Sequence, residues 1–250
     1  MSPASTLCLP EGYRENPAAS ADADGTPYWS DQLSDSVLQD RALRYQEPVY
    51  SYASRRHRGA SRTVLDVGCG TGHKLVRYFA AKADRLVGVD QGSGIERARR
   101  QFPEATWIEG DLATDEVWTA ANALRPDLVI CADVIEHLVD PIGLLDNLRD
   151  VLCGRLVLST PDRSRLDGAP PLGPPLNTRH VREWTMRELQ ELVRSRGFEI
   201  EHAGHLLPRS YARKMVEVRR ATWRALNRLP VPDRRSCSML VLRVDRPRTT

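Results

Sequence analysis

Three glycines at every second position form the pattern with the clearest chemical meaning in this chain. Gly68, Gly70 and Gly72 follow the apolar run 64–67, which predicts a strand that enters a turn before a helix. Glycines at these positions let the backbone turn sharply and approach a ligand with no side chain between them. Asp66, near the end of the strand, can accept hydrogen bonds from a cationic or amine-bearing ligand. The spacing fits neither the dinucleotide fingerprint nor a P-loop.

Two further acidic residues follow apolar runs that predict the next two strands. Asp90 ends the first run, about twenty residues beyond the glycines, and Asp111 follows the second. A carboxylate at the first position can accept hydrogen bonds from both hydroxyls of a ribose. Because NAD-binding proteins share this feature, it indicates a ribose without selecting the ligand. A helix cap is the alternative role for each acid alone.

A third group of reactive side chains comes from two separate segments. Asp133, Glu136 and His137 follow a fourth predicted strand, and His180 follows a Pro/Gly-rich loop at 163–179 that we expect to overhang the site. An imidazole suits proton removal near neutral pH, so His137 is the first candidate for a general base and His180 the second. Helix capping or structural packing is the alternative for both.

Alternating strand and helix patterns surround these residues and predict an α/β fold. Apolar runs of this kind are typical of parallel strands covered on both faces, with ligands bound beyond their carboxyl ends. The predicted strands are 63–67, 85–90, 106–109, 127–131, 155–159, 198–202 and 238–244. The predicted helices are 71–82, 93–102, 114–124, 140–152 and 185–196, the last with a capping box formed by Thr185 and Glu188.

The flanking segments define the expected domain organisation. We predict a disordered N-terminus at 1–26, a helical cap at 27–60 and the main domain at 61–250, with a helical insertion at 205–230 before the last strand. The cap would cover the ligand site and exclude water. A basic helix at 209–228 would either recognise a phosphorylated or carboxylated substrate or present a solvated face, with its apolar stripe on a lid or a second copy in a homodimer.

Composition narrows the classes of partner. The net charge is only +3 over 250 residues, so we expect no general nucleic-acid partner. The five cysteines are scattered, which favours buried thiols over disulfides or a metal site. No apolar run is long enough to cross a membrane, and no signal-peptide pattern is present, so we expect a cytoplasmic protein without a membrane partner.

The glycine segment resembles motif I of the class I S-adenosylmethionine-dependent methyltransferases, whose usual form is Asp-x-Gly-x-Gly-x-Gly. The segment 133–138, Asp-Val-Ile-Glu-His-Leu, resembles a second element of a broad group that includes ubiquinone-pathway O-methyltransferases and many small-molecule enzymes. Similarity continues through 158–162 and 180–185 and covers about 63–204. It implies a Rossmann-like fold with a mostly parallel seven-stranded sheet, and S-adenosylmethionine as cofactor with S-adenosylhomocysteine as product.

The resemblance also implies roles for individual residues. The glycine segment would shape the pocket for the methionine end, Asp90 and its neighbour would hold the ribose, the segment at 111–112 would meet the adenine edge, and Asp133 would lie near the amino acid or the acceptor. The implied cofactor-binding residues are Asp66, Gly68, Cys69, Gly70, Gly72, Asp90, Gln91, Asp111, Leu112 and Asp133.

We therefore predict methyl transfer to an oxygen of a small molecule, such as a sugar, phenol or polyketide in bacterial secondary metabolism, including antibiotic biosynthesis. The alternatives are N-methylation of a small molecule, metal-dependent 2′-O-methylation of RNA, and a non-catalytic protein that binds S-adenosylmethionine. The RNA alternative arises because Asp133, Glu136, His137 and His180 resemble the divalent-metal ligands of small-RNA 2′-O-methyltransferases. Asp133 replaces the usual Glu and has a shorter reach. We assign no metal ligands on this basis.

Overall fold

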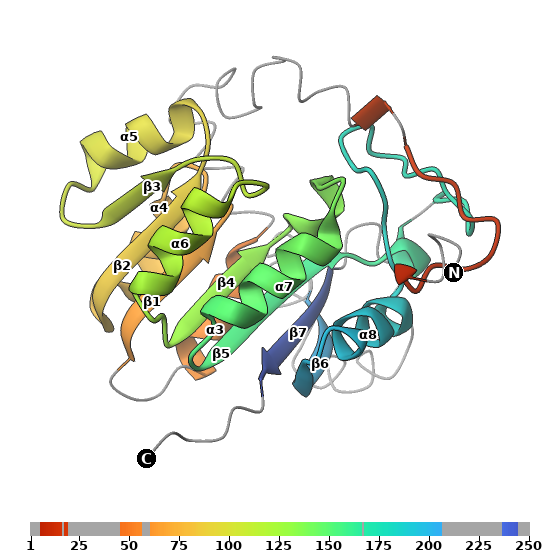
Figure 1. The fold of residues 1–250 in the computed structure, drawn as a ribbon. Coiled ribbons are helices and arrows are strands. Elements are labelled where there is room, and N and C mark those ends of the chain that lie inside the picture. Colours follow the sequence, from red (N-terminus) through yellow and green to blue (C-terminus); the bar gives the residue numbers. More distant parts are fainter. Residues whose placement is uncertain are drawn as a thin grey trace, which may run out of the picture.

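The computed structural model describes residues 6–16, 18–19, 46–56, 61–166, 168–206 and 237–244. These residues form one seven-stranded sheet in the order β3-β2-β1-β4-β5-β7-β6 (Figure 1). All neighbouring strands are parallel except for β7, which runs antiparallel to β5 and β6. The strands are β1 (Ser61–Val67), β2 (Ala83–Asp90), β3 (Thr106–Glu109), β4 (Leu128–Ala132), β5 (Arg155–Pro161), β6 (Glu199–Leu206) and β7 (Cys237–Arg243).

Helices cover both faces of the sheet, as the alternating pattern predicted. The α-helices are α3 (Glu47–Arg56), α4 (His73–Phe79), α5 (Ser93–Gln101), α6 (Asp115–Ala123), α7 (Pro141–Val151) and α8 (Met186–Ser195). Side chains of α6, α7 and α8 share one apolar core with alternate strand residues such as Leu65 and Val67. Val64, which points to the opposite face, packs with α3, α4 and α5. This arrangement is the predicted Rossmann-like fold.

Local sequence explains where several helices begin. Asp140 caps α7 by accepting a hydrogen bond from the Gly143 amide, and Pro141 occupies the first turn. Thr185 and Glu188 form the predicted capping box of α8. α7 leads back to β5, and α8 leads to β6. These caps therefore fix where the two helices that precede β5 and β6 begin.

The N-terminal segment differs from its prediction. Residues 6–16 were expected to lack structure, but Leu9 is buried and the Leu7 carbonyl accepts a hydrogen bond from the Trp184 indole at 3.0 Å. The Tyr13 hydroxyl accepts a hydrogen bond from the Glu183 amide at 2.9 Å. A few apolar and aromatic side chains therefore anchor a segment whose composition otherwise indicates disorder. Figure 1 shows this segment beside the chain that leads into α8.

Two predicted helical segments lie largely outside the described residues. Only the part of the predicted cap at 46–56 is described, and it contains α3, which ends with Arg55 and Arg56. The basic helix predicted at 209–228 lies entirely outside the described ranges. Within the described ranges the cysteines are free thiols, with Cys69 and Cys131 buried and Cys153 exposed. No described helix has the length and apolar character that crossing a membrane requires.

Candidate active site

The glycine segment forms a tight turn between β1 and α4. Gly68, Gly70 and Gly72 all have positive φ angles, of 75°, 57° and 72°. A Cβ on Gly72 would lie 2.2 Å from the Trp107 ring, so that position requires glycine. A Cβ on Gly70 would meet nothing within 4 Å, which leaves its side of the turn open to a ligand. The turn therefore has the close-approach geometry that the sequence predicted.

Asp66 is fully buried beneath this turn. The Tyr50 hydroxyl, from α3, lies 2.8 and 3.0 Å from the two carboxylate oxygens and donates its hydrogen to them. Burial raises the Asp66 pKa from 3.8 to about 7, although the nearby Lys74 charge and the Tyr50 hydrogen bond oppose this rise. A ligand ammonium group beside this carboxylate would compensate for the cost of burying its charge.

Asp90 ends β2 next to the glycine turn. One of its oxygens accepts a hydrogen bond from the Gly70 amide at 2.5 Å, and the other accepts one from the Gln91 amide at 2.8 Å. The Asp90 carboxylate thus braces the turn, a contact that the sequence did not predict. The ribose role of Asp90 and Gln91 remains a prediction.

The third acidic position lies just beyond β3. The exposed Asp111 accepts a hydrogen bond from the Ala113 amide at 2.9 Å, and thereby forms a turn before α6. The Leu112 carbonyl accepts the indole hydrogen of Trp118 at 2.8 Å, and its side chain packs against the core. Asp111 therefore forms a local turn and does not cap α6, whose N-cap residue is Thr114. The adenine role remains a prediction.

Asp133 follows β4 and has a left-handed backbone with φ of 55°, a conformation that Asp tolerates better than most residues. Its carboxylate accepts a hydrogen bond from the Ser159 hydroxyl at 2.9 Å. Burial raises its pKa above 3.8, against the opposing effect of this hydrogen bond and the nearby Lys74 charge. Asp133 interacts electrostatically both with Lys74, beside the glycine turn, and with the two histidines described next.

His137 ends the short 3-10 helix η2 (Ile135–His137). Its Nδ1 lies 2.9 Å from the Arg179 carbonyl oxygen. A carbonyl can only accept, so Nδ1 carries the hydrogen and Nε2 holds a free lone pair in the neutral ring. Although His137 is exposed, desolvation by surrounding protein atoms lowers its pKa below 6.5. The ring is therefore neutral at pH 7 and able to accept a proton.

His180 packs edge-on against His137, with ring centroids 4.8 Å apart. Its Nδ1 lies 2.6 Å from a Glu183 carboxylate oxygen and its Nε2 lies 2.8 Å from the Asn177 side-chain nitrogen. The Asn177 oxygen accepts the Arg179 amide, which assigns the nitrogen as the donor to His180. Both ring nitrogens of His180 are thus engaged. The structure therefore favours His137 over His180 as the base.

The histidines and Glu136 form a cluster that can hold a metal ion. One ligand atom from each of Glu136, His137 and His180 lies within 4.8 Å of the others. Glu136 is fully buried, and its Oε2 accepts the Thr160 hydroxyl at 2.9 Å while its Oε1 has no partner. Burial and the Asp133 charge raise the Glu136 pKa from 4.5 to about 8. Asp133 is not part of this three-residue cluster.

Several residues of this site were missed by the sequence analysis. Tyr50 lies in the predicted cap, but its hydrogen bond to Asp66 depends on how α3 packs. Lys74 is buried at the start of α4. A lysine directly before the apolar residues of a predicted core helix was the signal that could have identified it. Asn177 and Glu183, which hold His180, can be recognised only once the loop is folded.

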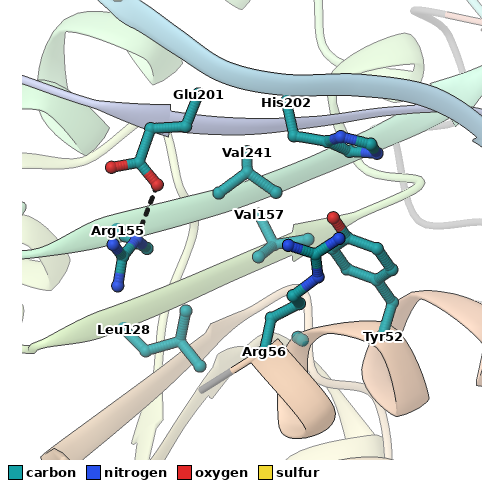
Figure 2. Close-up of a pocket in the computed structure, with 9 residues that line it drawn as sticks. Tyr52, Arg56, Leu128, Arg155, Val157, Glu201, His202 and Val241 are labelled. Atoms are coloured by element: carbon teal, nitrogen blue, oxygen red, sulfur yellow. Dashed lines mark hydrogen bonds and ion pairs between the residues drawn. The ribbon is translucent and has the colours of Figure 1, made fainter. Parts of the chain in front are cut away.

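A separate pocket of about 160 Å³ lies between α3 and β4 to β7 (Figure 2). Figure 2 shows Tyr52 and Arg56 reaching from α3 toward His202 on β6, beside the ion pair of Arg155 with Glu201. The pocket includes the first residues of β4 and β5, so it lies toward the amino ends of these strands. It is therefore distinct from the site at their carboxyl ends.

Sequence comparisons place this site in a known family. A family described as "Methyltransferase domain" matches residues 38–203. A probable S-adenosylmethionine-dependent methyltransferase of Mycolicibacterium smegmatis is 34% identical over 162 residues, which cover 64% of this chain and 60% of that protein. A ubiquinone biosynthesis O-methyltransferase of Psychrobacter cryohalolentis is 32% identical over 111 residues, covering 42% of this chain and 43% of that protein. The chain thus spans three fifths or less of the length of these two relatives.

Solved structures support the fold. Magnesium protoporphyrin IX methyltransferase from Synechocystis, with bound S-adenosylhomocysteine, aligns with a TM-score of 0.53 at 18% identity and covers 89% of this chain and 90% of its own. A methyltransferase from Mesorhizobium loti aligns with a TM-score of 0.57 at 19% identity and covers 78% and 97%. The sheet order, the glycine turn and the family match together show that this chain belongs to the class I S-adenosylmethionine-dependent methyltransferases.

Proposed function

We propose that this enzyme transfers the methyl group to a hydroxyl oxygen of a small molecule and that His137 acts as the general base. The observation that carries the proposal is the tautomer of His137. Its Nδ1–H is held by the Arg179 carbonyl, so Nε2 is left with a lone pair. A hydroxyl must lose its proton to become a strong nucleophile, whereas an unprotonated amine needs no such help.

The residues around the glycine turn fit the cofactor. The open side of Gly70 permits close approach, and the buried Asp66 carboxylate suits the ammonium group at the methionine end. S-adenosylmethionine supplies an electrophilic methyl group on a positively charged sulfur. The protein must then align the acceptor, exclude water and remove one proton.

Proton removal follows from the position of His137. When the bound cofactor gives its methyl group to the acceptor oxygen, Nε2 of His137 would take up the hydroxyl proton that the acceptor loses. The Arg179 carbonyl, which holds Nδ1–H, also interacts favourably with the imidazolium that results. This acceptor oxygen would belong to a sugar, phenol or polyketide of bacterial secondary metabolism, and the ubiquinone O-methyltransferase among the relatives supports a hydroxyl acceptor.

The acceptor atom can be tested with matched pairs of compounds. Incubation with S-adenosylmethionine labelled in its methyl group should label hydroxyl compounds from these classes, but not analogues that carry an amine at the same position. Mass spectrometry of the product locates the label. Transfer to the amines alone would contradict the proposal and favour the N-methylation alternative.

A metal-dependent route is the second candidate, because the contacts of the three clustered side chains favour it. The Nδ1–H of each histidine is held by a protein oxygen, so Nε2 is the nitrogen that could bind a metal, as in many metal sites. The buried Oε1 of Glu136 has no hydrogen-bond partner. A divalent ion bound by Glu136, His137 and His180 would lower the pKa of an acceptor hydroxyl, as the RNA alternative requires. Asn177 would first have to release Nε2 of His180.

Metal removal separates the two routes. Because the base route needs no ion, we expect chelation with EDTA followed by gel filtration to change the turnover rate by less than about twofold. Elemental analysis of the treated and untreated protein checks that any ion was removed. Loss of turnover that Mg²⁺, Mn²⁺ or Zn²⁺ restores would support the metal-dependent route.

A further inference from the structure

We propose that the Lys74 ammonium group binds the α-carboxylate of S-adenosylmethionine and so selects a cofactor with an intact amino-acid end. Lys74 lies in the first turn of α4, directly after the glycine turn, and its side chain is only 6% exposed. The family and the cofactor are established by the comparisons. The inference therefore does not depend on the proposed acceptor or on His137.

Lys74 is held in place by neutral groups. Its Nζ donates a hydrogen bond to the Gln46 side-chain oxygen and lies 5.3 Å from the centre of the Tyr50 ring. Gln46 is fixed in turn by a hydrogen bond of 2.8 Å from its amide to the Ala132 carbonyl at the end of β4. Within the described ranges, no carboxylate forms an ion pair with Lys74. Because an ammonium group has three hydrogens, Lys74 can still donate to a bound ligand.

The charges around Lys74 match a zwitterion. Asp66, Asp133 and Asp90 all interact electrostatically with Lys74, and burial lowers its pKa from 10.5 despite these acids. The methionine end of the cofactor carries one ammonium and one carboxylate group. Asp66 suits the first, but burying the carboxylate beside three acids without a cation would be costly. Among the described side chains, Lys74 is the buried cation at the glycine turn.

Tyr50 links the two charged groups of this site. Its hydroxyl donates to Asp66 and its ring lies beneath the Lys74 ammonium group. One residue of α3 therefore contacts both charged groups near the carboxyl end of β1. The site so defined has one anionic and one cationic side.

The test compares two ligands that differ only in the carboxylate. Calorimetric titration would use S-adenosylhomocysteine and its decarboxylated analogue, which keeps the amine. We expect Lys74→Met to weaken binding of S-adenosylhomocysteine by about 10- to 100-fold, because a charge-assisted hydrogen bond is lost. Binding of the decarboxylated analogue should change by less than about threefold. Lys74→Arg, which keeps the charge, should retain more affinity for S-adenosylhomocysteine than Lys74→Met.

Lys82→Met is the matched control, because the Lys82 ammonium group donates a hydrogen bond to the Ser54 carbonyl oxygen of α3. This variant should leave the affinities for both ligands unchanged. Thermal unfolding of each variant checks that it is folded. An equal loss for both ligands in Lys74→Met would show a merely structural role and overturn the proposal. So would tighter binding of S-adenosylhomocysteine, which would mean that Lys74 competes with the ligand ammonium for Asp66.

Discussion

The His137→Ala variant is expected to lose about 100- to 10,000-fold in kcat while binding S-adenosylmethionine within about threefold of the wild-type affinity. In the proposed reaction the lone pair on Nε2 of His137 accepts the acceptor proton, and no described contact links this ring to the glycine turn. The loss should therefore appear in turnover and not in cofactor affinity. Turnover is measured as release of S-adenosylhomocysteine with an identified acceptor, and affinity by calorimetry.

The pH profile gives a second measurement of the same role. Because the His137 pKa lies below 6.5, the wild-type kcat/KM for the acceptor, measured with S-adenosylmethionine saturating at every pH so that Asp66 does not contribute, should be level near pH 7 and fall as the ring gains a proton at lower pH. This acidic decline should disappear in His137→Ala, and added imidazole should restore part of the rate. His202→Gln is the control, because His202 stacks on Tyr52 in the separate pocket. A turnover rate unchanged in His137→Ala would remove the base assignment.

Much of this fold was accessible from local sequence. The boundaries predicted for the strand at 106–109 match β3, and the capping box at Thr185 is present. These features depend on residues close together in the chain, where periodicity and capping chemistry act. The strand predicted at 155–159 instead extends to Pro161, because its last residues pair with β7, far along the sequence. That extension had no local pattern to reveal it.

For the site, too, residues close together in the chain were predictable, whereas contacts between distant segments were not. The glycine turn and Asp66 lie within one short segment, so their residue types and spacing predicted them, although the bond from Gly70 to Asp90 appears only in the folded sheet. The contact between Tyr50 and Asp66 requires the cap helix to dock on the sheet. The difference between His137 and His180 requires the folded loop, because Asn177 and Glu183 occupy both nitrogens of His180. Residue types suggested two candidate bases, but only tertiary hydrogen bonds distinguish them.

Asp66→Asn is expected to weaken binding of S-adenosylhomocysteine by at least about 100-fold. Removing one partner of a buried ion pair costs about 3–5 kcal/mol, since the other charge is left uncompensated. The substitution keeps the size of the side chain and an oxygen for the Tyr50 hydroxyl, so the variant should fold. Calorimetric titration at pH 7 measures the loss, and Asp84→Asn at the exposed start of β2 is the comparison at a position without a buried charge. Wild-type affinity in Asp66→Asn would contradict the assignment of Asp66 to the ammonium group.

Because of the raised pKa of Asp66, a rise in pH should increase the affinity for the ligand but decrease the stability of the ligand-free protein. With a pKa of about 7 in the folded protein, Asp66 is mostly protonated at pH 5.5 and half ionised at pH 7, so the wild-type affinity for S-adenosylhomocysteine should rise about tenfold over this interval. Affinity in Asp66→Asn should lack this rise.

Stability without ligand should run the other way. The folded protein retains a proton on Asp66 that the unfolded chain releases near pH 3.8, so stability falls as pH rises from about 4 to 7, by as much as about 4 kcal/mol. Glu136 adds a slope of the same sign in both proteins, so the informative quantity is the difference between wild type and Asp66→Asn in urea unfolding at pH 5 and pH 7. Parallel pH dependence in the two proteins would contradict a buried, titrating Asp66. If the pH dependences differ as expected, saturation with S-adenosylhomocysteine should stabilise the wild type more at pH 7 than at pH 5. Burial alone disfavours the ionised Asp66 carboxylate, whereas the ligand ammonium group favours it.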